Sequence, residues 1–110
     1  MNVLPKEYSK KGFTYLLIER NDKAAIYLQM FGEQRLAFEV MKVVVAKPYQ
    51  IAGKDFPGGE SLPSDEAFGS WAWSFAIFNS EESAKKGALD KFNEITTYEN
   101  LRQERSSSSN

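Results

Sequence analysis

The sequence contains no cysteine and no histidine, and these absences exclude several classes of chemistry. Without cysteine, the chain forms no disulfide and has no thiolate nucleophile. Without histidine as well, it lacks the usual zinc ligands and has no imidazole to serve as a general base or a haem ligand. We therefore expect no metal and no cofactor, and any catalysis would depend on carboxylate, lysine, tyrosine or hydroxyl side chains.

Long apolar runs and a strong net charge are also missing. No stretch approaches the roughly 20 apolar residues that span a bilayer, and the first residues do not form a secretory signal. We therefore expect a cytoplasmic protein without a membrane partner. The net charge is −1, which gives no general attraction to nucleic acid. Charge is nevertheless uneven: residues 1–54 carry nine basic and five acidic groups, and residues 55–110 carry five and ten.

Alternating apolar residues predict four strands. Residues 13–20 and 25–31 form the first two, joined at Asn21-Asp22-Lys23, whose residue types favour tight turns. A third strand over residues 35–47 loses its alternation at Val43-Val44-Val45, which is typical of a strand buried on both faces. The clearest alternation lies in residues 70–79. One face of this fourth strand holds Trp71, Trp73, Phe75 and Ile77, and the other holds Ala72, Ser74 and Ala76.

A long loop and one helix complete the chain. Residues 48–69 contain three of the four prolines and four of the seven glycines, which predicts an irregular connection. A helix start is predicted at residues 79–82, with Asn79 and Glu82 at the spacing of a capping box. The apolar stripe that should face the sheet consists of Ala84, Ala88, Phe92 and Ile95, with Leu89 beside it. The following Thr96-Thr97 should weaken the helix.

The predicted fold class is therefore α+β. We expect a four-stranded antiparallel meander (ββββα), one C-terminal helix on one face and a long loop before the last strand. Residues 1–11 should be a flexible arm, 12–104 a single domain and 105–110 a disordered Ser-rich tail. One helix is too narrow to cover four strands, so the long loop or a second copy of the chain, as a homodimer, should cover the remainder.

The residues indicate two classes of non-catalytic binding. A protein partner would meet the incompletely covered sheet and the acidic, aromatic loop, with Phe56, Glu60, Asp65 and Glu66 as its contacts. The alternative is single-stranded nucleic acid stacking on sheet aromatics, although a near-neutral chain makes this less favourable. The residues of that alternative are Tyr15, Tyr27, Trp71 and Trp73, helped by Arg20, Arg35, Lys42 and Lys47.

A third alternative is a small carboxylate enzyme. Such an enzyme needs two acids converging in a cleft. The loop acids Asp55, Glu60, Asp65 and Glu66 are the candidates. Their spacing does not establish such a pair, and the glycines near Lys54 do not follow the phosphate-loop pattern. We therefore expect no catalytic residues and interpret the chain as a non-enzyme.

Several short motifs resemble small accessory proteins of tailed bacteriophages and mobile elements. Between residues 13 and 95 the shared features are Ile26-Tyr27, Phe38-Glu39-Val40, Pro63-x-x-Glu66-x-Phe68-Gly69, Trp71-x-Trp73 and Glu81-Glu82-x-Ala84. The resemblance supplies no catalytic residues. It implies an accessory protein that acts by binding and modulating a host or viral protein.

Overall fold

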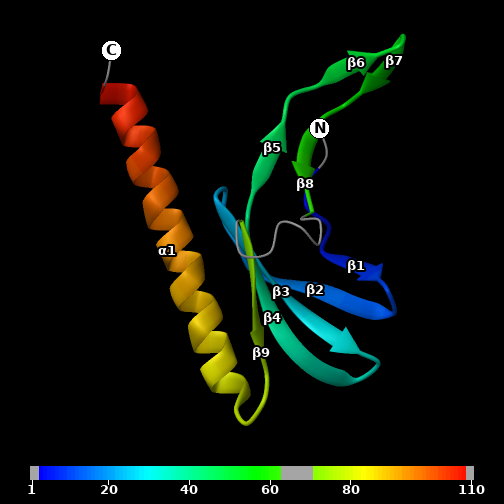
Figure 1. Ribbon diagram of the computed structural model, residues 1–110, viewed down its shortest axis with the longest axis vertical. Coiled ribbons are helices and arrows are strands. Elements are labelled where there is room, and N and C mark those ends of the chain that lie inside the picture. Colours follow the sequence, from blue (N-terminus) through cyan, green and yellow to red (C-terminus); the bar gives the residue numbers. More distant parts are fainter. Residues whose placement is uncertain (1–2, 63–70, 109–110) are drawn as a thin grey trace.

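A five-stranded antiparallel sheet and one helix form the body of the protein, as the computed structural model shows for residues 3–62 and 71–108 (Figure 1). The sheet order is β1-β2-β3-β4-β9. Its strands are β1 (Glu7–Lys10), β2 (Phe13–Arg20), β3 (Ala24–Phe31), β4 (Gln34–Lys42) and β9 (Ala72–Ala76), and the helix is α1 (Glu81–Ser108). The predicted α+β class, antiparallel meander and C-terminal helix are confirmed.

Between β4 and β9 the chain leaves the sheet and forms a narrow two-stranded projection. Its lower part pairs β5 (Val44–Ala46) with β8 (Gly59–Ser61), and its tip pairs β6 (Tyr49–Ile51) with β7 (Lys54–Phe56). We call residues 44–61 the extension. Figure 1 shows it pointing away from the sheet. Most of the predicted irregular loop is thus a pair of short β-hairpin segments.

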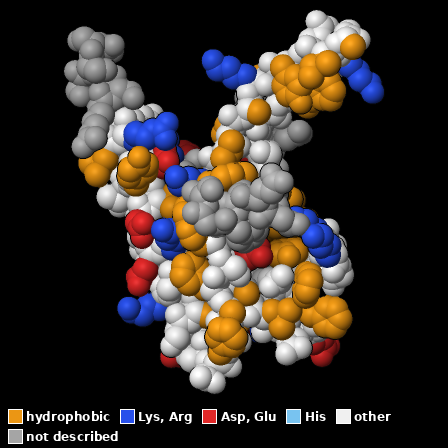
Figure 2. Space-filling model, viewed as in Figure 1, with side chains coloured by type: hydrophobic (Ala, Val, Ile, Leu, Met, Phe, Trp, Pro, Cys, Tyr) orange, Lys and Arg blue, Asp and Glu red, His pale blue; other side chains and the backbone are white. Residues whose placement is uncertain are grey.

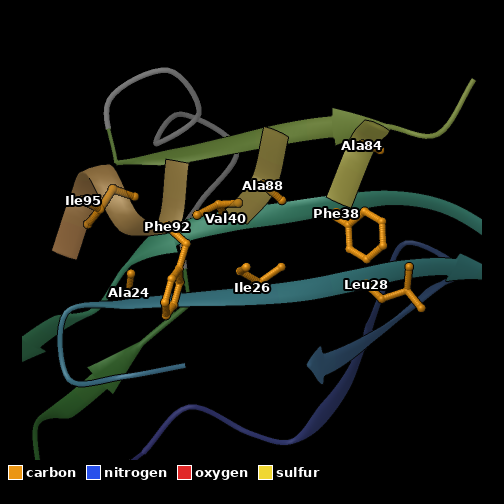
Figure 3. Packing of buried hydrophobic residues seen from close by; sticks show 9 residues of the cluster. All are labelled: Ala24, Ile26, Leu28, Phe38, Val40, Ala84, Ala88, Phe92 and Ile95. Carbon is orange, nitrogen blue, oxygen red and sulfur yellow. The ribbon is translucent and has the colours of Figure 1, made fainter. Parts of the chain in front are cut away.

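One face of the sheet packs against the helix (Figure 3). Ile26 and Leu28 of β3 and Phe38 and Val40 of β4 form the sheet side of this cluster. The helix side consists of Ala84, Ala88, Phe92 and Ile95, with Leu89 packed alongside. This is the predicted stripe, and the helix period of 3.6 residues places all four residues on one side of α1.

The opposite face of the sheet has an apolar cluster of its own. Its buried members include Tyr15, Tyr27 and Met41, and Leu4 packs on them from the N-terminal segment. Tyr8 of β1 and Leu62, which follows the extension, pack at the edges of the cluster. The second face is therefore covered by segments from both sides of the sequence.

The expectation of a flexible arm over residues 1–11 is wrong for residues 7–10. These residues form β1, which pairs with β2 from Glu7 opposite Leu16 to Lys10 opposite Phe13. The connection is a two-residue turn in which Lys11 and Gly12 both have positive φ, 53° and 86°. Positive φ at both central positions is the geometry of the type I′ hairpin turn. Lysine is uncommon there, which is why the turn was not predicted.

The expectation that Val43-Val44-Val45 is buried on both faces is also wrong. Val43 packs on the second cluster, but Val44 and Val45 are exposed. The cause is that β4 ends at Lys42, and β5 then belongs to the extension, which has no third layer to cover it. The absence of alternation here reflects a strand with two open faces.

The helix is longer than the sequence predicts. It begins one residue later than the expected cap, because the hydroxyl of Ser80, not Asn79, accepts the bond from the Ser83 amide at 3.2 Å. It continues past Thr96, whose hydroxyl donates to the Phe92 carbonyl at 2.8 Å and accepts from the Asn21 side chain at 2.9 Å. Residues 105–108, expected to be a disordered tail, are helical.

Candidate functional site

The candidate site is a cleft between the extension and the last turns of the helix. Ile95 is the last helix residue in the buried core, so residues 96–108 continue for about 20 Å at 1.5 Å per residue. We call residues 96–108 the helix overhang. Figure 1 shows the overhang and the extension at the same end of the molecule, diverging from each other.

The cleft holds a hollow of about 420 Å³. Val44 and Val45 of β5 form its apolar wall, and Glu99 and Arg102 of the overhang form the opposite wall. Lys42, the last residue of β4, lies between the two walls. A hollow with one apolar wall and one charged wall suits an amphipathic segment of another molecule.

Positive charge is in slight excess in the cleft. Its charged lining residues are Asp22, Lys23, Lys42, Glu99 and Arg102, three cations against two anions. The carboxylate of Glu99 lies 3.8 Å from the Lys42 ammonium and 3.7 Å from the Arg102 guanidinium, so one anion serves two cations. The cleft should therefore favour a negatively charged group.

Exposed apolar side chains are concentrated on the two projections. Among the described residues, ten large apolar side chains are exposed, and six of them lie on the extension or the overhang. These six are Val44, Val45, Tyr49, Ile51, Tyr98 and Leu101. Figure 2 shows the apolar patch on the extension. Concentrated exposed apolar surface of this kind marks interaction sites.

An ion pair fixes the base of the extension to the body. Arg20 of β2 donates two hydrogen bonds to Glu60 of β8, at 2.7 and 2.8 Å, and the Leu4 amide donates a third at 2.9 Å. The hydrogen bonds from Arg20 are the main cause that lowers the pKa of Glu60 to about 2. We call this arrangement the clamp. It uses both carboxylate oxygens of Glu60 within the chain.

The contacts predicted for a protein partner have different fates in the structure. Phe56 lies on the extension, with its ring stacked on that of Tyr49 at 4.9 Å between centroids. Glu60 belongs to the clamp, so its carboxylate is a structural group here. Asp65 and Glu66 lie outside the described residues. The structure brings Phe56 and Glu60 to the two ends of the extension and does not gather them into one cluster.

The aromatics proposed for nucleic-acid stacking do not form an open platform. Tyr15 and Tyr27 are buried in the second cluster, and the Tyr27 hydroxyl donates to the Pro5 carbonyl at 2.6 Å. Burial is the main cause that raises the pKa of Tyr27 to about 12. Trp73 lies half-buried against the helix, with the Lys91 ammonium 4.2 Å from its ring centroid. Trp71 is half-buried at the start of β9.

The cationic residues named with those aromatics are likewise dispersed. Arg20 belongs to the clamp, and Arg35 pairs with Glu81 near the helix start. Only Lys42 lines the cleft, whereas Lys47 lies on the extension between β5 and β6. They do not form one basic surface.

The sequence reasoning missed the cleft residues Val44, Val45, Glu99 and Arg102. The triple valine was noticed but interpreted as a buried strand. A signal was present in the residues that follow, since Lys47-Pro48 is unusual in the interior of a central strand. The overhang residues gave no signal, because their position opposite β5 depends on tertiary structure.

No protein-family model, curated protein or solved structure matches this chain. Within residues 3–62 and 71–108, no group of three or more acidic side chains converges in a way that would hold a metal ion. Over the same residues, no helix combines the length and apolar character needed to cross a membrane. The cleft is therefore assessed on its own geometry.

Proposed function

We propose that this chain is a non-catalytic protein-binding module that holds an extended segment of its partner in the cleft. The observation that carries the proposal is the placement of Val44 and Val45, two exposed apolar residues of a strand, along a hollow opposite the charged overhang. Exposed valines contribute little to the stability of the chain that carries them, but they gain stability when a partner covers them.

The open edge of β5 defines how the partner binds. Within the described part of the chain, β5 pairs with β8 alone, so the edge of β5 away from β8 has no strand beside it. Figure 1 shows β5 between β8 and α1. An extended peptide added to this edge would hydrogen-bond with the β5 backbone, cover the valines and pass in front of Arg102.

The charge of the cleft defines the chemistry of the partner segment. Three cations and two anions line it, and Glu99 is shared between two of the cations. A segment that alternates β-branched residues with Asp or Glu matches both walls. The resemblance to accessory proteins of phages and mobile elements supports a host or viral protein as the source of that segment.

The test is selection of displayed peptides on the wild-type protein, followed by affinity measurement on two variants. Val45→Lys places a cation on the apolar wall and should weaken binding of the selected peptides by about tenfold or more. Phe31→Lys is the matched control, because Phe31 is 58% exposed against 56% for Val45 but lies at the far end of β3. Its affinity should equal that of the wild type.

Two outcomes would contradict the proposal. Equal losses in Val45→Lys and Phe31→Lys would show that the cleft is not the binding site. Binding of single-stranded oligonucleotides, with an affinity that falls steeply with salt and is unchanged in Val45→Lys, would favour the nucleic-acid alternative. Tryptophan fluorescence reports both titrations, since Trp71 and Trp73 are the chain's two indoles.

A further inference from the structure

The outer edge of β9 is an unprotected sheet edge. In the described part of the chain, β9 pairs only with β4 and ends the sheet. The opposite edge strand, β1, contains Glu7 and Lys10 and is flanked by Lys6 and Lys11. Charged residues of this kind protect edges from pairing with other chains. β9 reads Ala-Trp-Ser-Phe-Ala and has no charge, no proline and no bulge.

The backbone of β9 presents hydrogen-bonding groups at this edge. Trp71 and Ile77, which flank the strand, both bond to the neighbouring segment of β4 at 2.8 Å. Bonding direction alternates along a strand, so the amides and carbonyls of Ala72, Ser74 and Ala76 point away from β4. The residues Ser74 and Ala76 are exposed, which leaves this part of the edge accessible.

We propose that two copies of the chain pair antiparallel through their β9 edges, about a twofold axis at Ser74. The two five-stranded sheets then become one continuous sheet of ten strands, and Ser74 lies opposite Ser74 of the second copy. Ala72 of each copy lies opposite Ala76 of the other. A self-complementary contact of this kind gives a closed dimer with no further open ends.

The occupant is a second copy because β9 is nearly symmetric about Ser74. Small residues stand at the centre and two positions away on either side, and aromatic residues stand at Trp73 and Phe75. Antiparallel pairing about the centre sets Trp73 of one copy opposite Phe75 of the other, twice, on the helix face of the sheet. Aromatic cross-strand pairs of this type stabilise sheets.

Charge and size also favour self-pairing. The strand is neutral, so two copies bring no like charges together, whereas pairing through β1 would desolvate Glu7 and Lys10. On the face opposite the helix, Ser74 and Ala76 are small and exposed, so a second strand meets no bulky side chain there. The dimer leaves the cleft unoccupied, and this inference does not depend on the proposed function.

A single-cysteine cross-link tests the axis directly, since the chain has no other cysteine. In a hydrogen-bonded antiparallel pair the two Cα atoms lie about 5.5 Å apart. A disulfide bridges Cα atoms about 4.4–6.8 Å apart. Ser74→Cys should therefore form a disulfide-linked dimer rapidly under mild oxidation. Ser9→Cys, at an exposed serine of the β1 edge, is the matched control and should cross-link slowly. Equal rates would overturn the proposal.

The mass in solution gives the second measurement. The wild type should sediment at twice 12.5 kDa, and Val45→Lys should leave that mass unchanged. Ser74→Lys sets two ammonium groups against each other across the axis and should weaken the dimer about tenfold or more, whereas Ser9→Lys should not. Circular dichroism checks that Ser74→Lys folds; if it does not, the cysteine cross-link decides. A wild type that sediments as a monomer, or a dimer broken only by Ser9→Lys, would overturn the proposal.

Discussion

The sheet body and the extension are built from the same kinds of residue but differ in what covers them. In the body, Ile26, Tyr27 and Phe38 are almost fully buried because the sheet has a covered face on each side. In the extension, Val45 and Ile51 remain exposed because a two-stranded hairpin has no layer above or below it. Apolar residues therefore stabilise the body, whereas those of the extension are free to contact another molecule.

The largest expected effect comes from the body. Phe38→Ala should lower the free energy of unfolding by about 3–5 kcal/mol, because the ring is buried among β3, β4 and the helix and its loss leaves a cavity. Urea unfolding followed by circular dichroism measures it. Phe78→Ala is the matched control: Phe78 is 88% exposed, and its change should stay within about 0.5 kcal/mol. Similar losses in both variants would remove the distinction between buried and exposed aromatics.

The clamp, where the two regions meet, should give the next largest effect. Glu60→Gln leaves the Arg20 guanidinium without its charged partner and should cost about 1–3 kcal/mol of unfolding free energy. Asp55→Asn, which neutralises an exposed carboxylate near the tip of the extension, should cost almost nothing. If the two variants are equally stable, the base of the extension does not depend on the clamp.

The clamp should also be visible as a function of pH. The pKa of Glu60 in the folded chain, about 2, lies below its ordinary value of 4.5, so the folded state favours the charged carboxylate. Its contribution is complete above pH 4.5 and is lost as the pH falls toward 2. The stability of the wild type should therefore fall more steeply across this range than that of Glu60→Gln. Parallel pH profiles would contradict the assignment.

A smaller, local effect should come from Gly58 within the extension. Its φ is 68°, and an added Cβ would lie 2.5 Å from the Ala46 carbonyl oxygen. Gly58→Ala should therefore disrupt the β5–β8 pairing, at a local cost of about 1–2 kcal/mol, and leave the helix-covered core intact. Amide hydrogen exchange separates the two regions. Gly53→Ala also has a positive φ but meets no neighbouring atom, so faster exchange at β5 in Gly53→Ala alone would be contrary to this expectation.

The smallest effect on stability is expected at the tip of the extension. Ile51→Ser removes an exposed apolar side chain and should change the unfolding free energy by less than about 0.5 kcal/mol. The measurement is the same urea titration used for Phe38→Ala. A loss comparable to that of a core residue would mean that the extension has a packing partner within the chain.

The sequence was sufficient to predict the parts of the fold in which local pattern and burial agree. Alternation identified the strands that became β2, β3, β4 and β9, and the 3.6-residue period identified Ala84, Ala88, Phe92 and Ile95 as the buried side of the helix. The turn at Asn21 was also predictable, because its side-chain oxygen accepts hydrogen bonds from the Lys23 and Ala24 amides at 2.8 and 2.9 Å.

The missed features depend on contacts between distant residues. β1 contains a single apolar residue, Tyr8, and its pairing depends on a turn with Lys11 in an unusual conformation. The helix continues beyond Thr96 because Asn21, 75 positions earlier, bonds the threonine hydroxyl. Glu60 looked like a surface acid until the fold brought Arg20 beside it. None of these partners can be identified from the spacing of residues along the chain.

The hydrogen bond between Lys42 and Trp71 has a consequence for the order of folding events. These residues end β4 and precede β9, and the intervening 28 residues, which include the extension, form a closed loop when the Lys42 amide meets the Trp71 carbonyl. The hairpins β1–β2, β2–β3 and β3–β4 close over a few residues each, so they can form early. Docking of β9 must overcome the entropy of a much longer closure, which makes it the slower step.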